Sequence, residues 1–396
     1  MDIELLEGEK LKLNDGKVPV VTMSDDAINK KYREGEIRIV TEQARYPLNT
    51  IASMVKNTEE YKMNPEYQRR HRWSNAKRSA LIESLIMNVP LPPIFLYEYD
   101  YSCYEVMDGL QRLTAISSFY ENEFPLEGLT KWPELNDKRY HELPKLVKQG
   151  IDRRYISSII LLNETAKTPE QAEQLKQMVF DRINSGGEKL ESQEKRNANF
   201  DGKLNRLCIR LSENESLCST WGIPPHVDGS DGIHSERASN KLFKTMYDVE
   251  LVLRFFAYRQ KHDLHTGSLE SYLDRFLEKG NYFSQEVLDS LADIFNQTID
   301  LAYDIFGEQA FQLYRERKGN WSWYDRSTIA VYDPMMLVLS QNLDNKAVLV
   351  SSKTEIVAAI EGFYQANYEA FGGRNVNESA LKERENLLAK FFEGFV

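Results

Sequence analysis

Strand-like and helix-like patterns are unevenly distributed along this chain, and that distribution limits the folds open to it. Before about residue 200, short runs rich in β-branched and aromatic residues alternate with apolar residues at helical spacing. After it, strand-like runs nearly vanish and one-faced apolar stripes follow, as at 269–277 and 288–295. The pattern predicts an α+β fold: an N-terminal domain with a small mixed sheet, followed by an all-α helical domain.

The chain is long enough for two domains, each with its own core. It has 396 residues, of which 41% are hydrophobic and 28% charged, which excludes a disordered or fibrous protein. We divide it into an N-terminal arm at 1–35, a β-containing domain at 36–200 and a helical domain at 201–396. No internal repeat of the solenoid type is present.

Charge argues against a global attraction to nucleic acid. Lys plus Arg number 50 and Asp plus Glu 61, a formal net charge of 50 − 61 = −11. The residues after 200 alone carry 21 − 29 = −8. One short segment is basic, because 66–78 holds a single acid, Glu66, against five cations: Arg69, Arg70, Arg72, Lys77 and Arg78. We expect contact with phosphate there.

Several common site types lack support. The three cysteines include no CxxC pair, and the six histidines show no metal-ligand spacing, so neither a disulfide framework nor a zinc site is indicated. The P-loop and the GxSxG elbow are also absent. The apolar runs are too short to span a bilayer, and we expect a soluble, cytoplasmic protein without membrane contact.

The order of strands and helices in the β-containing domain can be predicted from the sequence. We predict a strand at 37–40, a helix opened by Pro47, and a helix at 74–88 capped by Ser74. Two adjacent strands should follow at 94–99 and 103–107, then a glycine turn and a helix from about 111. A further strand is expected at 155–162 and a further helix at 169–184.

The first candidate site is the junction Asp108-Gly109-Leu110-Gln111-Arg112 between a strand and a helix. Unpaired N–H groups and the helix dipole favour an anion such as phosphate at a helix start. Arg112 offers a bidentate clamp, Gln111 an amide that positions water, and Asp108 a carboxylate for Mg²⁺ or general base work. The structural alternatives are that Asp108 caps the helix and that Arg112 pairs with a nearby acid.

Two further segments carry polar side chains of interest. In 64–73, arginines are interleaved with Tyr67 and Trp73, which suits phosphate binding with a ring stacked on a base. The alternative is a basic loop anchored in the core by its aromatic residues. In 180–190, Asn184 and Ser185 precede a Gly-Gly pair and are predicted to donate hydrogen bonds into the Arg112 pocket; a helix C-cap and turn is the alternative.

Together these segments resemble the N-terminal domain of the GmrSD type IV restriction endonuclease family, a ParB-like domain of bacterial defence proteins. Its PxYQRxxxW, DGQQR-RLT and FxRINxGGxxL motifs stand here at 65–73, 108–114 and 180–190. Order and spacing agree, and the similarity covers about 36–200. Leu110 departs from the motif, because it replaces the first glutamine of the pair. The helical remainder resembles the connecting region that follows this domain in the family.

The resemblance implies binding and hydrolysis of a nucleoside triphosphate with Mg²⁺, in the service of DNA restriction. It assigns catalysis to Asp108, Gln111 and Arg112, with Asp108 also on the metal. Nucleotide or phosphate binding is assigned to Gln68, Arg69, Gly109, Asn184 and Ser185, and DNA binding to Arg70, Arg72 and Trp73. Family members often carry a C-terminal HNH nuclease, but no histidine follows His265 and no HNH pattern is present. A partner nuclease subunit is therefore one expectation, and an oligomer is compatible with the sequence.

Three functions stay open from the sequence. The first is a Mg²⁺-dependent nucleoside triphosphatase of a DNA-defence system. The second is a non-catalytic module that binds nucleotide or DNA and acts with a partner nuclease chain. The third is an interaction protein whose acidic helical half contacts a partner or mimics DNA, although a charge of 21 − 29 = −8 is modest for a mimic.

Overall fold

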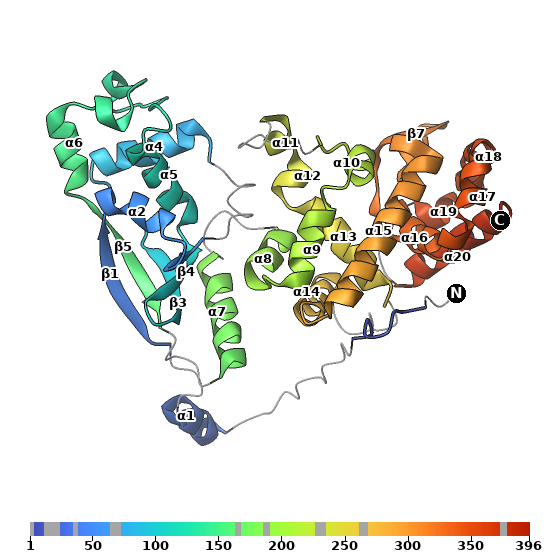
Figure 1. The fold of residues 1–396 in the computed structure, drawn as a ribbon, viewed down its shortest axis with the longest axis horizontal. Helices are drawn as coiled ribbons and strands as arrows, with labels where there is room; N and C mark the ends of the chain where they lie inside the picture. Colours follow the sequence, from blue (N-terminus) through green and yellow to red (C-terminus); the bar gives the residue numbers. More distant parts are fainter. Residues whose placement is uncertain are drawn as a thin grey trace. The chain divides into compact units, whose positions relative to one another are not determined.

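The structure is a computed structural model, and by its contacts the chain divides into two compact units. It describes residues 4–11, 24–34, 39–63, 73–162, 168–184, 191–225, 235–260, 268–372 and 378–396. We call Val18–Leu190 the sheet unit and Met1–Lys17 with Glu191–Val396 the helical unit. Figure 1 labels the helices and strands of both, and each unit is described by itself.

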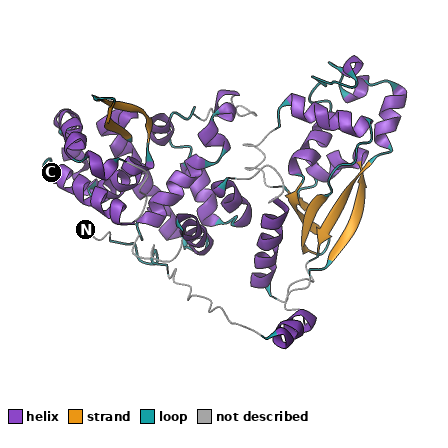
Figure 2. Ribbon diagram, turned by 180° about the vertical axis from the view of Figure 1, so that it is seen from behind, coloured by secondary structure: helices purple, strands orange, loops and turns teal. Residues whose placement is uncertain are grey.

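The sheet unit contains one mixed five-stranded sheet with the strand order β1-β5-β3-β4-β2. Its strands are β1 (Thr41–Pro47), β2 (Tyr61–Lys62), β3 (Ile94–Asp100), β4 (Cys103–Asp108) and β5 (Tyr155–Leu161). β3 pairs antiparallel with β4 and parallel with β5, whereas β1 pairs antiparallel with β5 and β2 parallel with β4. Figure 2 shows these strands as one twisted sheet. The small mixed sheet expected from the sequence is confirmed.

Helices cover both faces of this sheet, and the sequence of β3 explains why. Ile94 and Leu96 point into the larger core, which is formed with α2 (Ile51–Lys56), α4 (Asn75–Ile86), α5 (Leu110–Tyr120) and α6 (Lys145–Asp152). The alternate residues Phe95 and Tyr97 belong to a second cluster, with α7 (Pro169–Asn184) on the opposite face. A strand covered on both faces reads as a nearly continuous apolar run, as this one does.

Two N-terminal elements lie later in the chain than predicted. The strand expected at 37–40 is β1, which begins at Thr41, and residues 35–38 lie outside the described residues. β1 gives little apolar signal because its side chains are mostly exposed and its position is set by pairing with β5. The helix predicted to open at Pro47 starts as the 3-10 turn η1 (Leu48–Thr50) and continues as α2. By contrast, the cap of α4 is as predicted, since Ser74 Oγ accepts from the Lys77 N–H at 3.3 Å.

The helical unit is built around buried helices. Its longer helices are α13 (Tyr247–Tyr258), α14 (Leu269–Gly280), α15 (Gln285–Phe306), α16 (Ile329–Ser340), α18 (Lys353–Ala366) and α20 (Glu378–Glu393). Shorter ones are α8 (Ser192–Asn199), α9 (Lys203–Leu211), α10 (Glu215–Trp221), α11 (Ser235–Ser239), α12 (Lys241–Lys244), α17 (Lys346–Ser351) and α19 (Tyr368–Phe371). Most residues of α13 and α16 are buried, because both helices are apolar around most of their circumference. None of the helices in the described ranges is both long and apolar enough to cross a membrane.

The second domain is mostly helical, as expected, and it also contains one β-hairpin that the sequence did not predict. The strands β6 (Gln312–Arg317) and β7 (Asn320–Ser327) form an antiparallel hairpin within the helical unit. Its strands are polar on one side, so they lack the apolar run by which the strands of the sheet unit stand out. The Lys318-Gly319 pair between them is the local turn signal that identifies it.

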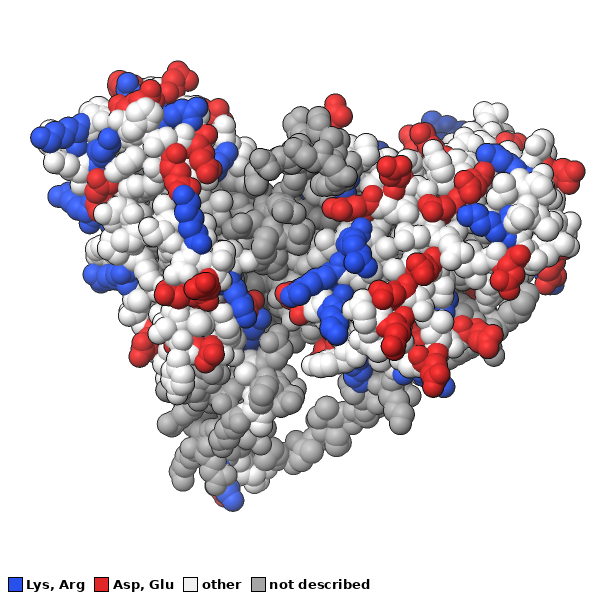
Figure 3. All heavy atoms as spheres, viewed as in Figure 1, with Lys and Arg blue, Asp and Glu red and all other residues white. Residues whose placement is uncertain are grey.

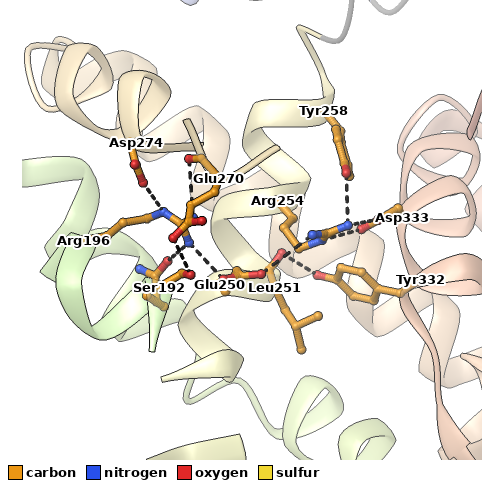
Figure 4. Close-up of polar contacts among 11 residues, drawn as sticks. Ser192, Arg196, Glu250, Leu251, Arg254, Tyr258, Glu270, Asp274, Tyr332 and Asp333 are labelled. Carbon is orange, nitrogen blue, oxygen red and sulfur yellow. Dashed lines mark hydrogen bonds and ion pairs between the residues drawn. The ribbon is translucent and has the colours of Figure 1, made fainter. Parts of the chain in front are cut away.

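The contacts place the boundary between the units at 190/191, so α8 belongs to the helical unit. The reason is Arg196 on α8, which is only 2% exposed and is held by carboxylates of two other helices. Its Nη1 lies 2.9 Å from Glu250 Oε2, and its Nε lies 2.6 Å from Asp274 Oδ1. Figure 4 shows this pairing continuing through Glu250 to Arg254 and Asp333.

The first residues of the chain also belong to the helical unit. Glu9, within the expected N-terminal arm, is buried and accepts from Arg259 Nε at 2.8 Å. The Gln260 side chain bonds to the backbone of the same N-terminal segment. Its Nε2 donates to Glu9 O, and its Oε1 accepts from the Leu11 N–H. Further along the arm lies α1 (Asp25–Glu34), which is grouped with the sheet unit.

Candidate functional site at the β4–α5 junction

The junction between β4 and α5 requires a glycine. β4 ends at Asp108 and α5 begins at Leu110, and Gly109 between them has a φ of 96°, in the left-handed region. A Cβ added there would lie 2.4 Å from Ile94 Cγ2 of the neighbouring strand. Gly109 therefore allows both the sharp turn and the close packing of the helix start on the sheet.

Arg112 is tied to the end of β4 and to the loop before β3. Its Nη2 lies 2.8 Å from Asp108 Oδ2, and the same nitrogen donates to Pro93 O at 3.3 Å. Its Nη1 donates to the Pro92 carbonyl. The side chain is 12% exposed, and that of Asp108 is 36% exposed. Burial lowers the pKa of the Arg112 guanidinium, whereas the charge of Asp108 opposes the shift.

These contacts decide between the alternatives left open for the two residues. Arg112 does pair with a nearby acid, as the structural reading proposed, and that acid is Asp108. Asp108 is not the helix cap, because Gly109 occupies the N-cap position and makes no side-chain bond. Arg112 binds Asp108 through Oδ2, and within the described part of the chain the other carboxylate oxygen accepts no hydrogen bond. The second carboxylate oxygen of Asp108 is therefore available to bind a ligand.

Gln111 joins the start of α5 to the start of α4. Its Oε1 accepts from the backbone N–H of Trp73 at 3.3 Å, although the two residues are 38 positions apart. Trp73 directly precedes Ser74, the N-cap of α4. The N-terminal ends of two helices therefore meet at one place. Both ends present N–H groups without intrahelical partners, and each helix start favours an anion.

Trp73 itself is anchored. It is only partly exposed and packs against the larger core of the sheet unit, and Lys77 Nζ lies 4.9 Å from its ring centroid. This agrees with the anchoring alternative for that tryptophan. Gln68, Arg69, Arg70 and Arg72 of the same segment lie outside the described residues.

Leu110 is 7% exposed and faces the interior. An apolar residue at this position is therefore accommodated by burial, although the motif has a glutamine there. The hydroxyl of Thr114, one turn later, bonds back to the Leu110 carbonyl at 2.9 Å.

The third segment is brought to β4 by α7. Lys176 Nζ lies 2.8 Å from Glu105 Oε2 near the middle of the strand, and Phe180 shares a cluster with Met107 beside its end. The C-terminal end of α7 therefore lies toward the end of β4. Asn184 is the last residue of this helix, and its side chain is outside the described set, as is Ser185.

Metal binding at this junction rests on Asp108 alone among the described residues, which contain no group of three or more His, Cys, Asp or Glu suited to a metal ion. A single carboxylate suits Mg²⁺, which is commonly held by one or two carboxylates together with substrate phosphates and water. Bound there, Mg²⁺ would neutralise phosphate charge. The donor set fits a cation that arrives with a nucleotide and does not fit a structural metal.

Sequence reasoning missed the groups that hold the site in shape. These are the carbonyls of Pro92 and Pro93 on Arg112, the Trp73 N–H on Gln111, and Lys176 on Glu105. Backbone partners carry no side-chain signature, and the Lys176 pair depends on how α7 crosses the sheet.

Comparison with protein families gives one assignment. Residues 49–200 match the family model described as GmrSD restriction endonuclease, N-terminal domain. Comparisons with curated proteins and with solved structures gave no significant match. The match confirms the resemblance seen in the three motifs, while the ParB-like assignment and the lack of an HNH nuclease stay predictions. Residues 49–200 thus match the N-terminal domain of the GmrSD restriction endonucleases, and this match suggests a restriction-type protein of phage defence.

Proposed function

We propose that the β4–α5 junction binds a nucleoside triphosphate with Mg²⁺ and hydrolyses it, and that this reaction controls action on foreign DNA. One observation supports the proposal above others: the starts of α4 and α5 meet beside an available carboxylate of Asp108. Two helix N-termini favour phosphate, and the carboxylate suits its metal ion.

We assign each residue of the junction a role in binding or hydrolysis from its contacts. Gly109 provides the sharp turn at which α5 starts and the phosphate binds. Asp108 would hold Mg²⁺ with the carboxylate oxygen that Arg112 does not bind, and Gln111 would orient a water molecule for attack on the phosphate. Arg112 is largely buried and holds Asp108 and the Pro92 carbonyl, so it acts first as a positioning residue whose charge also favours the phosphoryl transition state.

The remaining assignments extend the same proposal. Gln68, Arg69, Asn184 and Ser185 also bind the nucleotide phosphates. Arg70, Arg72 and the partly exposed Trp73 contact DNA. A partner nuclease chain supplies DNA cleavage, and the protein acts in the cytoplasm.

The test is phosphate release by the full chain with each of the four nucleoside triphosphates and Mg²⁺, with and without DNA. Gln111→Ala should lower turnover by about 10²-fold, within the range for loss of one positioned catalytic group. Gln149→Ala, an exposed glutamine of α6, is the matched control and should turn over as wild type does. Arg112→Ala should abolish turnover, with Arg153→Ala as its exposed control. Full hydrolysis by both Gln111→Ala and Arg112→Ala would overturn the proposal.

A second function is favoured by the way Arg112 is occupied. Three of its contacts are internal, so the arrangement also suits a module that binds nucleotide without hydrolysing it and acts with a partner nuclease chain. Such a module should show nucleotide-dependent stabilisation that grows with ligand concentration, and no phosphate release. Wild-type turnover decides between the two.

A further inference from the structure

We propose that the β6–β7 hairpin of the helical unit is a contact for the phosphate backbone of duplex DNA. The inference rests on the proposed function only in that the protein acts on DNA. It concerns a different unit from the nucleotide site and a segment outside the matched family domain.

The hairpin has a defined tip. Arg317 pairs with Asn320, so Lys318 and Gly319 form a two-residue turn. Their φ values are 54° and 81°, both positive, as a type I′ turn requires. Such a turn matches the natural twist of the two strands. The tip therefore presents Lys318 in a fixed place, beside Arg317.

The inner face of the hairpin is anchored by aromatic residues. Trp321 and Trp323 contact Tyr368 of α19 and Tyr364 of α18, with ring centroids 5.4 and 6.1 Å apart. Trp323 Nε1 also donates to Glu361 Oε1 at 3.0 Å. Tyr314 stacks on Trp321 with centroids 5.8 Å apart. The hairpin is thus a rigid ribbon with one face left for a partner.

The outer face is cationic because strand alternation sorts the charges. Arg315 and Arg317 share one face of the ribbon, whereas Glu316 lies opposite Trp321 on the other face. Glu316 and Asp325 are both exposed, so the cationic character of the outer face comes from alternation and not from burial of the acids. The Arg315 guanidinium lies 3.8 Å from the ring centroid of Tyr324, which holds it in place. Arg317 and Lys318 are both exposed, and neither forms an ion pair with another described residue.

This charge stands out against its surroundings. Residues 312–327 carry four cations and two carboxylates, 4 − 2 = +2, whereas the residues after 200 together carry 21 − 29 = −8. Acidic side chains are prominent on the face of the helical unit seen in Figure 3. An acidic protein needs a local cationic surface to approach DNA, since its overall field repels phosphate.

Shape favours a duplex over other polyanions. The major groove of B-DNA admits a two-stranded β-ribbon, and arginines bind its phosphates with paired hydrogen bonds. The aromatic rings of the hairpin face inward or lie beneath Arg315, so they are not available to stack on the bases of a single strand. An acidic protein could bind the same cations without a groove. The experiment must therefore distinguish binding of an acidic protein from binding of a duplex.

The experiment measures binding of a labelled duplex to the full chain by fluorescence anisotropy over a range of salt concentrations, without nucleotide. Each lost phosphate contact should reduce the slope of log K against log salt by roughly one unit. The triple variant Arg315→Ala, Arg317→Ala, Lys318→Ala should therefore lose about three units of slope. The matched control removes the same charge from exposed residues of α9, as Lys203→Ala, Arg206→Ala, Arg210→Ala, and should keep the wild-type slope.

Phosphate release, measured on the same samples, separates this inference from the proposed function. The hairpin variant should hydrolyse nucleotide at the wild-type rate if the wild type does so. An unchanged DNA slope in the hairpin variant would overturn the inference, as would an equal loss in the α9 control. Failure of the wild-type protein to bind the duplex would also overturn the inference. If the wild-type protein bound an acidic polypeptide through the hairpin instead, the hairpin would be a contact for a protein.

Discussion

Two arginine–aspartate pairs, one in each unit, differ in burial, and this difference decides whether the aspartate can bind a ligand. In the helical unit, Arg254 is 2% exposed and Asp333 6%, and the pair is bidentate: Nε lies 3.1 Å from Oδ1, and Nη2 bonds Oδ2. In the sheet unit, Arg112 is 12% exposed and Asp108 36%, and a single nitrogen reaches a single oxygen. Both pairs are salt bridges between two secondary-structure elements, but only the Arg112–Asp108 pair leaves one carboxylate oxygen without a hydrogen bond from a described residue.

The difference teaches what each pair can do. Both oxygens of Asp333 are used inside the core, and Asp333 raises the pKa of Arg254 although burial acts in the opposite direction. That pair fixes α13 against α16, as Figure 4 shows, and has no group left for a ligand. The Asp108 pair orients a carboxylate at a helix start and is suited to binding. Three substitutions test this contrast, from the largest expected effect on stability to the smallest.

Asp333→Ala should produce the largest loss. It would leave the Arg254 charge buried without its partner, and breaking a buried pair in this way costs about 3–5 kcal/mol. The urea midpoint of the full chain reports it. The double variant Arg254→Met, Asp333→Leu should recover most of the loss, because burying apolar groups of similar size removes the unpaired charge. A single variant as stable as wild type would show that the pair carries no structural weight.

Gly109→Ala should come next, since it strains the junction without touching any charge. Alanine at a φ of 96° with its Cβ 2.4 Å from Ile94 Cγ2 should cost about 1–3 kcal/mol. Phosphate release should fall with it, because the helix start moves. The control is Gly150→Ala in α6, where the added Cβ meets nothing within 4 Å; it should be neutral or slightly stabilising. Equal effects of the two substitutions would contradict the steric argument.

Asp108→Asn should change stability least and activity most. The pair with Arg112 is partly exposed, so its loss should cost no more than about 1 kcal/mol. Phosphate release should nevertheless fall by about 10²-fold or more, because the ligand for Mg²⁺ is gone. Glu123→Gln, an exposed carboxylate of the same unit, serves as control. Thermal unfolding and turnover measured together would show whether stability and activity separate as the comparison requires.

Local sequence pattern predicted much of the sheet unit. The predicted strands at 94–99 and 103–107 correspond to β3 and β4, and the predicted helix at 169–184 has the bounds of α7. These elements have strong periodicity and clear breaks at Pro92-Pro93 and Asp108-Gly109. The polar edge strand β1 and the β6–β7 hairpin were misplaced or missed, because their positions depend on pairing and on packing against helices rather than on an apolar run.

The candidate site was foreseen in part. Its motif residues, the glycine turn and the cap of α4 follow from residue types and spacing. Their meeting does not, since the bond between Gln111 and Trp73 joins residues 38 positions apart. The sequence predicts an ion pair with an unspecified nearby acid as one role of Arg112, and the structure shows that this acid is Asp108.

The sequence by itself determined the fold class, the family domain at 49–200 and the strand–glycine–helix junction, because these depend on local periodicity, on turn chemistry and on motif order. Only the tertiary structure decided which charged groups are buried and which meet solvent. Arg196, Arg254 and Arg112 look alike in the sequence, yet the first two are enclosed by carboxylates of neighbouring helices and the third leaves Asp108 accessible. Desolvation depends on everything packed around a group, and no local pattern contains that information.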